Sequence, residues 1–250
     1  MLTDTRHQAI LRRVRLQGAV SVEGLAEEFG VSRSTIRRDL ATLSRDGLLR
    51  RVRGGGSTVE QDTDSFDVVD RRAADDKDAV ADRAAGLIED GQVVCLDIGT
   101  TTARLARRLR GRRLTVITSS LAVVDELRHE SAPEVIMLGG VLRSTYQSLV
   151  GLLTEQALSQ LSANLCFLST SGVNPGGQVL DTTGIEVAVK RAMLAASDRS
   201  VLLADRGKFP GTGLLSVCDA SDIDVLVTNR GADPATLEQM RAAGTEVVEA

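Results

Sequence analysis

The chain has 250 residues, of which 42% are hydrophobic, and a formal net charge of −4 at pH 7. This length allows one good hydrophobic core and a small second domain. Residues 1–15 are charged and lack an apolar run, and the uncharged stretch 156–180 is rich in Ser, Gln, Asn and Gly. We therefore expect neither a signal peptide nor a membrane span.

The cysteines and histidines point to no metal site. Cys95, Cys166 and Cys218 lie in apolar, strand-like runs without close pairing, so we expect buried thiols and a location in the reducing cytoplasm. The two histidines, His7 and His129, are far apart in the sequence, and a metal site needs clustered ligands. We expect no metal and no cofactor.

Two helices are predicted before residue 31. The first spans about Thr5–Leu16, is followed by Gly18, and places on one face His7, Ile10, Leu11 and Val14. The second spans Ser21–Phe29 and has apolar residues at i, i+3, i+4 and i+7, with Gly30 placed to end it.

Residues 31–40, Val-Ser-Arg-Ser-Thr-Ile-Arg-Arg-Asp-Leu, predict a third helix. Ser32 is a good N-cap, and Ile36, Leu40 and Leu43 form one apolar stripe. The opposite face carries small, hydroxyl and guanidinium groups, which suit the major groove of DNA. We predict a helix-turn-helix that contacts DNA through Ser32, Arg33, Ser34, Thr35, Arg37 and Arg38.

The charge distribution supports this prediction. Residues 1–56 contain 11 basic and 6 acidic residues, a net charge of +5, whereas residues 57–250 contain 19 and 28, a net charge of −9. A basic end on an acidic body suits a protein that meets phosphates at one end. The alternative is a small helical bundle whose arginines are merely solvated.

The segment after Gly47 is basic and glycine-rich. We interpret residues 48–56 as a hairpin-like wing whose Arg51 and Arg53 contact the DNA backbone or a minor groove. The alternative is a flexible basic linker. Binding to single strands, which uses stacked aromatic side chains, is not favoured in a chain with no Trp, one Tyr and four Phe.

The rest of the chain predicts an α/β domain. We place a DNA-binding domain at 1–56, an acidic linker at 57–76 with a short helix around 66–72, and the α/β domain at 77–250. From Lys77 onwards, helical segments alternate with short apolar strands at 93–96, 114–117, 135–138, 165–168, 201–203 and 225–227. This alternation predicts a mostly parallel sheet with both faces covered.

Polar motifs follow several of these strands, where α/β sheets bind ligands. Asp97 ends a strand, Gly99 permits a tight turn, and Thr100–Thr102 open the next helix, an arrangement that suits a phosphate. Gly139-Gly140 and Lys208 follow two other strands. The alternatives are that the threonines only cap the helix, the glycines make a turn, and Lys208 is a surface lysine.

Motifs along most of the chain resemble the DeoR-type family of bacterial transcriptional regulators. In the DNA-binding segment the motif is Val31-Ser32 with residues 35–40, followed by the glycine-rich wing. The later motifs are Lys77 at a helix start, Asp97–Thr102, Leu138-Gly139-Gly140, Gly151 at a helix start, and Asp205 with Lys208-Phe209. Each motif is weak alone, but the set at this spacing is specific.

The resemblance implies a winged helix-turn-helix followed by an effector domain that resembles ribose-5-phosphate isomerase and senses phosphorylated sugars. Carried over by position, the effector site would comprise Asp97, Gly99, Thr100, Thr101, Thr102, Ser119, Gly139, Gly140, Tyr146 and Lys208, with Gln147 nearby. Three positions depart from the pattern: Ser119 where Asn is usual, Asn229 where Asp is common, and Arg53 in place of a wing histidine. The first two bear on the effector and the third on the operator.

Two functions are considered. The first is a repressor of a carbohydrate operon, not an enzyme, that binds double-stranded operator DNA as a homo-oligomer, either a dimer or a tetramer. A phosphorylated sugar would control it by binding one state better. The second is a sugar-phosphate isomerase with an appended DNA-binding head, which needs a positioned carboxylate base. The available acids are not paired in the sequence, so we predict no turnover: Asp97, Asp181, Glu186 and Asp205.

Overall fold

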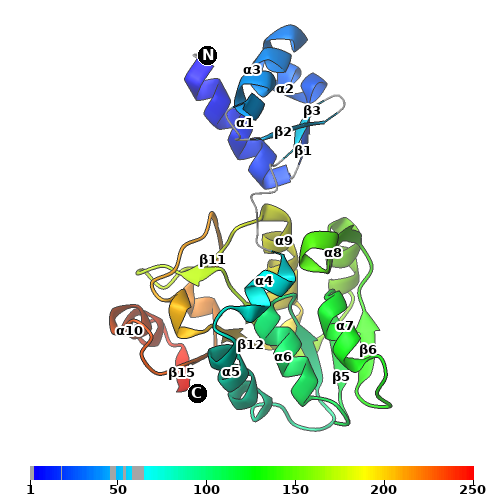
Figure 1. Cartoon of the computed structure of the whole chain (residues 1–250), viewed down its shortest axis with the longest axis vertical. Helices are drawn as coiled ribbons and strands as arrows, with labels where there is room; N and C mark the ends of the chain where they lie inside the picture. Colours follow the sequence, from blue (N-terminus) through cyan, green and yellow to red (C-terminus); the bar gives the residue numbers. More distant parts are fainter. Residues whose placement is uncertain (1–2, 18, 46–48, 53–54, 58–64) are drawn as a thin grey trace. The chain divides into compact units, whose positions relative to one another are not determined.

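The computed structural model describes residues 3–17, 19–45, 49–52, 55–57 and 65–250. These residues fall into two compact units, one made largely of residues 1–63 and the other largely of residues 64–250. Figure 1 shows the small unit in blue and the large unit in cyan to red. The domain boundaries given above stay a prediction.

The small unit combines helices with a small antiparallel sheet. Its described elements are α1 (Thr3–Gln17), β1 (Ala19–Ser21), α2 (Val22–Phe29), α3 (Arg33–Arg45), β2 (Arg50–Val52) and β3 (Gly55–Ser57). The strand order is β1-β3-β2, so the hairpin predicted after Gly47 is present, and β1 adds a strand that was not predicted. Buried aliphatic side chains from all three helices form the core, among them Ile10, Leu25, Ile36 and Leu40.

A glycine in the wing is required by packing. The backbone of Gly55 passes so close to β1 that a Cβ at this position would lie 1.9 Å from the carbonyl oxygen of Val20. No other residue type fits there without moving one of the two strands. Gly55 therefore serves the pairing of the wing with β1.

The large unit is built on a seven-stranded parallel sheet. In chain order its strands are β4 (Val93–Leu96), β5 (Thr115–Thr118), β6 (Glu134–Met137), β9 (Ala163–Ser169), β12 (Ser197–Leu203), β14 (Val225–Thr228) and β15 (Glu246–Glu249). Their spatial order is β15-β14-β12-β9-β4-β5-β6, and every neighbouring pair is parallel. The predicted α/β class with a mostly parallel sheet is confirmed.

Helices cover both faces of this sheet. They are α4 (Phe66–Arg71), α5 (Ala74–Ala85), α6 (Thr100–Arg108), α7 (Leu121–Leu127), α8 (Leu152–Leu158), α9 (Gly184–Ala195) and α10 (Pro234–Ala242). Figure 1 shows α5, α6 and α7 side by side over one face. The crossover from β9 through α9 to β12 runs in the opposite direction, so a right-handed connection places α9 on the other face.

Short antiparallel elements that were not predicted complete the large unit. A hairpin joins β7 (Val141–Arg143) to β8 (Ser148–Val150), and a three-stranded sheet joins β10 (Gly172–Val173), β11 (Val179–Asp181) and β13 (Leu215–Cys218). Short 3-10 helices follow at η1 (Ser144–Tyr146), η2 (Arg206–Lys208) and η3 (Ala220–Asp222). These elements lie outside the parallel sheet and carry several of the polar residues described below.

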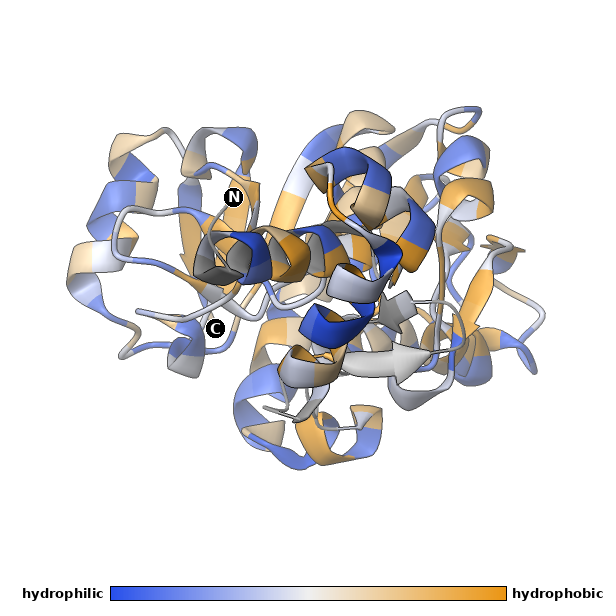
Figure 2. Cartoon of the chain, turned by 90° about the horizontal axis from the view of Figure 1, so that it is seen from above, coloured by the Kyte–Doolittle hydropathy of each residue, from blue (hydrophilic) through white to orange (hydrophobic). Residues whose placement is uncertain are grey.

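The core is aliphatic and the helices are amphipathic. Seen from above in Figure 2, hydrophobic and hydrophilic residues alternate along the helices, as expected where one side of each helix is buried. Cys95, Cys166 and Cys218 are free and buried, as predicted. Cys95 and Cys166 are register partners on β4 and β9, a proximity that their separation in the sequence conceals.

Candidate functional site

Helix α3 has one buried and one exposed face. Its apolar stripe, Ile36, Leu40 and Leu43, is buried in the core of the small unit, as predicted. Gly30 adopts a φ of 62° and ends α2, and the Ser32 hydroxyl accepts a hydrogen bond from the Thr35 N–H at 3.1 Å. The predicted end of α2 and cap of α3 are therefore present, and the two helices form a helix-turn-helix.

A buried ion pair joins α1 to α3. The Asp39 carboxylate accepts hydrogen bonds from Arg6 at 2.6 and 3.1 Å, and His7 Nε2 lies 3.1 Å from it. Burial alone would raise the pKa of Asp39, but the hydrogen bonds from Arg6 and His7 outweigh it, so this pKa lies below its usual value. Asp39 therefore holds α3 against α1.

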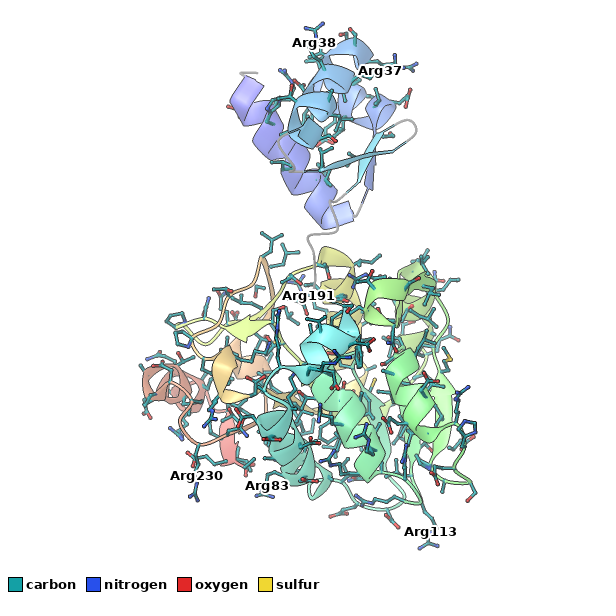
Figure 3. All side chains as sticks on the ribbon, in the orientation of Figure 1. Arg37, Arg38, Arg83, Arg113, Arg191 and Arg230 are labelled. Carbon is teal, nitrogen blue, oxygen red and sulfur yellow. The ribbon has the colours of Figure 1, made fainter. Side chains whose placement is uncertain are left out.

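The exposed face of α3 carries Ser34, Arg37 and Arg38. Figure 3 shows the side chains of Arg37 and Arg38 extending away from the helix. No ion pair of either guanidinium is present among the described residues, whereas Arg33 lies 3.7 Å from Glu23. Guanidinium groups without an acidic partner can bind phosphates or guanine.

Two of the predicted DNA contacts belong to the wing. Arg51 lies on β2, and the orientation of its side chain is outside what the structure describes. Arg53 lies outside the described residues. The wing contacts therefore stay a prediction.

The direction in which strands are added to the large sheet reverses between β4 and β9. From β4 the chain adds β5 and β6 on one side, and from β9 it adds β12, β14 and β15 on the other. Parallel α/β sheets bind ligands beyond the carboxyl ends of the strands at such a reversal. Asp97 and Ser169 lie at these two strand ends, and the Ser169 N–H donates to the Asp97 carboxylate at 2.9 Å.

The turn from β4 into α6 is tightly packed. A Cβ at Gly99 would lie 2.3 Å from the side chain of Ser169, so only glycine fits against the end of β9. The Thr102 hydroxyl donates to the carbonyls of Asp97 and Gly99 at 2.7 Å each, which makes it a cap of the turn. The first N–H groups of α6, at Thr100 and Thr101, have no intrahelical acceptor and lie at the positive end of the helix, where both residues are buried.

Lys190 of α9, which was not among the residues predicted from the sequence, reaches the end of β4 as well. Its ammonium group bonds to the Asp97 carboxylate and to the Ser169 carbonyl at 2.8 Å, and lies 3.5 Å from the Asp181 carboxylate. Burial alone would lower the pKa of Lys190, but the charges of Asp97 and Asp181 outweigh it, so this pKa lies above its usual value. Asp97 therefore holds Lys190 and does not offer an unpaired carboxylate.

The remaining acids of the isomerase hypothesis also have partners. Glu186 pairs with Arg143, and the Asp205 carboxylate accepts a hydrogen bond from the Gly207 N–H at 3.0 Å. A general base for proton transfer needs a carboxylate directed at the substrate. These pairings argue against an isomerase.

Two lysines lie near each other beyond the sheet. Lys208 ends the η2 turn after β12, and Lys77 of α5 is buried and donates to the Val69 carbonyl. Burial lowers the pKa of Lys77 to about 8; the Asp205 charge opposes this shift and the Lys208 charge adds to it. Lys77 was predicted only to begin a helix, and the structure brings it near the predicted Lys208.

Asn229 ties the η2 turn to α5. Its side-chain oxygen accepts from the Arg206 N–H at 3.2 Å, and its amide donates to the Asp76 carbonyl at 2.9 Å. This is the position at which the sequence departs from the common Asp. An amide can make both bonds because it has a donor and an acceptor, which a carboxylate does not.

The predicted residues on β5 and β6 have different environments. Ser119 follows β5 and is buried, and its Oγ has no hydrogen-bond partner among the described residues. A Cβ at Gly140 would lie 2.4 Å from Thr154 Oγ1, whereas one at Gly139 would meet no atom within 4 Å. Packing therefore requires Gly140, and only Gly139 leaves space for a ligand to approach.

Helix α4 packs against α6 and against Tyr146. Arg104 of α6 pairs with Asp70 of α4 at 3.0 Å and with Asp78 of α5. Phe66 of α4 contacts Tyr146, whose pKa is raised to about 12 by burial. The predicted Tyr146 thus lies between α4 and the charged groups around Lys190.

The structure brings most, but not all, of the predicted effector residues together. Asp97, Gly99, Thr100–Thr102 and Ser119 follow the adjacent strands β4 and β5, and Gly139 follows β6 at the same edge. Lys208 follows β12, which is separated from β4 by β9. In the described part of the chain, no group of three His, Cys, Asp or Glu side chains could hold a metal ion, and no helix is long and apolar enough to cross a membrane.

The two units together define a class of protein, a DNA-binding regulator with a separate sensor domain. A family model described as the DeoR-like helix-turn-helix domain matches residues 6–62, and one described as the DeoR C terminal sensor domain matches residues 72–230. The chain belongs to the DeoR family of transcriptional regulators.

Several relatives align along most of this chain. The L-fucose operon activator of Haemophilus influenzae is 34% identical over 90% of this chain and 91% of its own. The glycerol-3-phosphate regulon repressor of Escherichia coli K12 is 32% identical over 92% of both chains. Among solved structures, ribose 5-phosphate isomerase A of Methanocaldococcus jannaschii is 18% identical over 54% of each chain, with a TM-score of 0.41.

Proposed function

We propose that this protein is a cytoplasmic repressor of a carbohydrate operon, and that a phosphorylated sugar controls its binding to double-stranded operator DNA. The start of α6 at the reversal between β4 and β9 carries the effector part of this proposal. There the free N–H groups of Thr100 and Thr101 lie in the strand-end position that suits a phosphate. Lys77 and Lys208 add positive charge beyond the sheet.

The effector site that we propose has two parts. Phosphate would bind at Gly99, Thr100 and Thr101 with Lys208, while Asp97 and Thr102 hold the turn in shape. Ser119, Gly139 and Tyr146 would surround the sugar. The Ser119 hydroxyl has no hydrogen-bond partner among the described residues, and a hydroxylated ligand would supply one, since buried polar groups are usually hydrogen-bonded. Gly140 supports this wall by its packing on Thr154.

The DNA-binding part rests on the exposed face of α3. We propose that Arg37 and Arg38 read base edges or phosphates, and that the wing contacts the backbone. The remaining contacts would come from Ser32, Arg33, Ser34, Thr35, Arg51 and Arg53. The names of the relatives, an L-fucose operon activator and a glycerol-3-phosphate regulon repressor, support a role in carbohydrate regulation.

A thermal-shift screen tests the effector assignment. The full chain would be melted with a panel of sugar phosphates, with each unphosphorylated parent, and with inorganic phosphate. Binding to the native state raises stability by about 2.7 kcal/mol when the ligand is at 100 times its Kd. We expect one phosphorylated sugar to raise the Tm while its parent does not.

Matched variants make the screen specific. Lys208→Met should reduce the shift caused by that phosphate, whereas Arg83→Met, which removes the same charge from an exposed site on α5, should leave it unchanged. If no phosphorylated sugar in a broad panel raised the Tm, or if both variants behaved alike, the assignment would be wrong.

A further inference from the structure

One flank of the large unit is apolar and exposed. Strand β6 is the last strand of the parallel sheet, and it is followed by the β7–β8 hairpin and then by α8. These elements expose large aliphatic side chains, with exposed fractions between 36% and 68%, at Ile136, Met137, Val141, Leu142, Leu152 and Leu153. We call these six residues the apolar flank; Figure 2 shows hydrophobic residues on the right-hand side, where β6 lies.

The apolar flank is held together by packing between its elements. The Thr154 hydroxyl of α8 donates to the Gly139 carbonyl at 2.7 Å, and Gly140 packs directly on Thr154 and Val150. These contacts fix the start of α8 beside the turn from β6 to β7. The exposed side chains of α8 therefore lie close to the turn that joins β6 to β7, along the same edge of the sheet.

We propose that the apolar flank is the surface through which two copies of this chain associate. The first reason is the open edge of β6. Among the described residues no strand pairs with its outer side, and residues 135–142 contain no charged residue. Monomeric proteins protect an exposed edge strand with charges or a covering element; the charged residue of β6, Glu134, lies at its first position, and residues 135–142 carry no charge.

The second reason is size. The exposed fractions of the six residues add up to more than three whole aliphatic residues, on the order of 500 Å² of apolar surface. A stable interface takes about 800 Å² from each partner, and in homodimers about 65% of that area is apolar. The apolar flank is therefore about as large as the apolar part of one side of a homodimer.

The third reason is that two copies of this chain can pair symmetrically. An edge strand can pair with the same strand of a second copy about a two-fold axis, which closes the assembly and leaves no free edge. A helix-turn-helix also reads an operator as two half-sites, which a two-fold pair of chains supplies. A second copy of this chain is thus the occupant that the fold favours.

The test is the oligomeric state of the full chain. Sedimentation velocity and light scattering at micromolar concentration should show a dimer or a larger even-numbered assembly for the natural sequence. V141E combined with L152E places two carboxylates in the apolar flank and should weaken association at least tenfold. L153K, made separately, should act in the same direction and guards against one variant that fails to fold.

The control is Leu214, an aliphatic residue that is 41% exposed and lies before β13, outside the apolar flank. L214E should leave the assembly unchanged, and all variants should keep the circular dichroism spectrum of the natural chain. A monomeric natural chain would overturn the proposal. So would folded flank variants that associate like the natural chain, or an L214E variant that dissociates to the same extent as the flank variants.

Discussion

Phe66 of α4 and Tyr146 of η1 meet edge to face, with ring centroids 5.8 Å apart and planes inclined at 76°. Phe66 is buried in the main core of the large unit, and Tyr146 packs against that core from the loop beyond β6. The contact joins a helix near the start of the large unit to a residue of the proposed effector site. Edge-to-face pairs of this geometry add about 0.5–1.5 kcal/mol beyond their buried area.

Loss of the Phe66 ring should destabilise the large unit. We expect Phe66→Leu to lower the free energy of unfolding by about 1–2 kcal/mol, because the variant loses the aromatic contact and leaves a small cavity. Urea unfolding followed by circular dichroism would measure this. Tyr146→Phe keeps both rings and is the matched control, which should keep nearly the natural free energy of unfolding; a Phe66→Leu variant as stable as this control would contradict a contribution from the ring contact.

The ion pair between Arg6 and Asp39 should make the small unit sensitive to acid. Because the folded pKa of Asp39 is depressed, its contribution is present above the unfolded pKa and is lost as the pH falls through the folded pKa. We expect Asp39→Asn to cost about 3 kcal/mol at pH 7 and to flatten the acid limb of the stability curve. The measurement is urea unfolding between pH 3 and 7.

A double variant separates charge from packing at this site. Arg6→Met with Asp39→Leu removes both charges and keeps apolar volume, so it should recover most of the stability that Asp39→Asn loses. Recovery would show that the cost comes from burying the Arg6 charge without the opposite charge of Asp39. A double variant as unstable as the single one would contradict this explanation.

Lys77 should produce a pH dependence of the same sign as Asp39, but at alkaline pH. Its folded pKa is lowered to about 8, so between pH 8 and its ordinary value of 10.5 the unfolded chain binds the proton that the folded chain has lost. The free energy of unfolding should therefore gain a rising contribution over this window. Lys77→Met should remove that contribution, as measured by urea unfolding at pH 7, 8, 9 and 10.

Arg38 should contribute directly to operator binding. We expect Arg38→Ala to weaken binding to a DNA duplex selected from a random pool by at least tenfold, since one bidentate arginine contact supplies about 1–3 kcal/mol of discrimination. Arg83→Ala removes the same charge from an exposed helix of the large unit and should not change the affinity. Fluorescence anisotropy at fixed salt would compare them; equal affinities would remove Arg38 from the interface.

The fold was predictable where the sequence has a strong local period. The stripe Ile36, Leu40, Leu43 and the apolar strands that begin at Val93 and Val225 were identified correctly because burial repeats at the helix or strand spacing. The antiparallel strands β10, β11 and β13 were missed. Each has only two to four residues, and their pairing depends on segments distant in the sequence.

Only those residues of the candidate site that lie on loops at the strand ends could be predicted from the sequence. Asp97 and Gly99 follow a clear strand, whereas Lys190 lies in the middle of α9 and meets Asp97 only because the crossover to β12 brings α9 there. One signal was present in the sequence: Lys190 lies on the buried face of an amphipathic helix, beside Val187 and Met193. A lysine on such a face needs a buried partner, and the partner cannot be named without the fold.

Cys95 and Cys166 lie side by side on the two central strands, fully buried, and the hydrogen bond with the Cys95 thiol together with burial raises the pKa of Cys166 well above its ordinary value. A thiol reacts as a thiolate and only where a reagent can reach it. In the native fold Cys166 meets neither condition, and Cys95 is buried beside it. A thiol-specific reagent can therefore label these two residues only when the sheet opens. The labelling rate reports how often the sheet opens, so it measures unfolding of the large unit without an added probe.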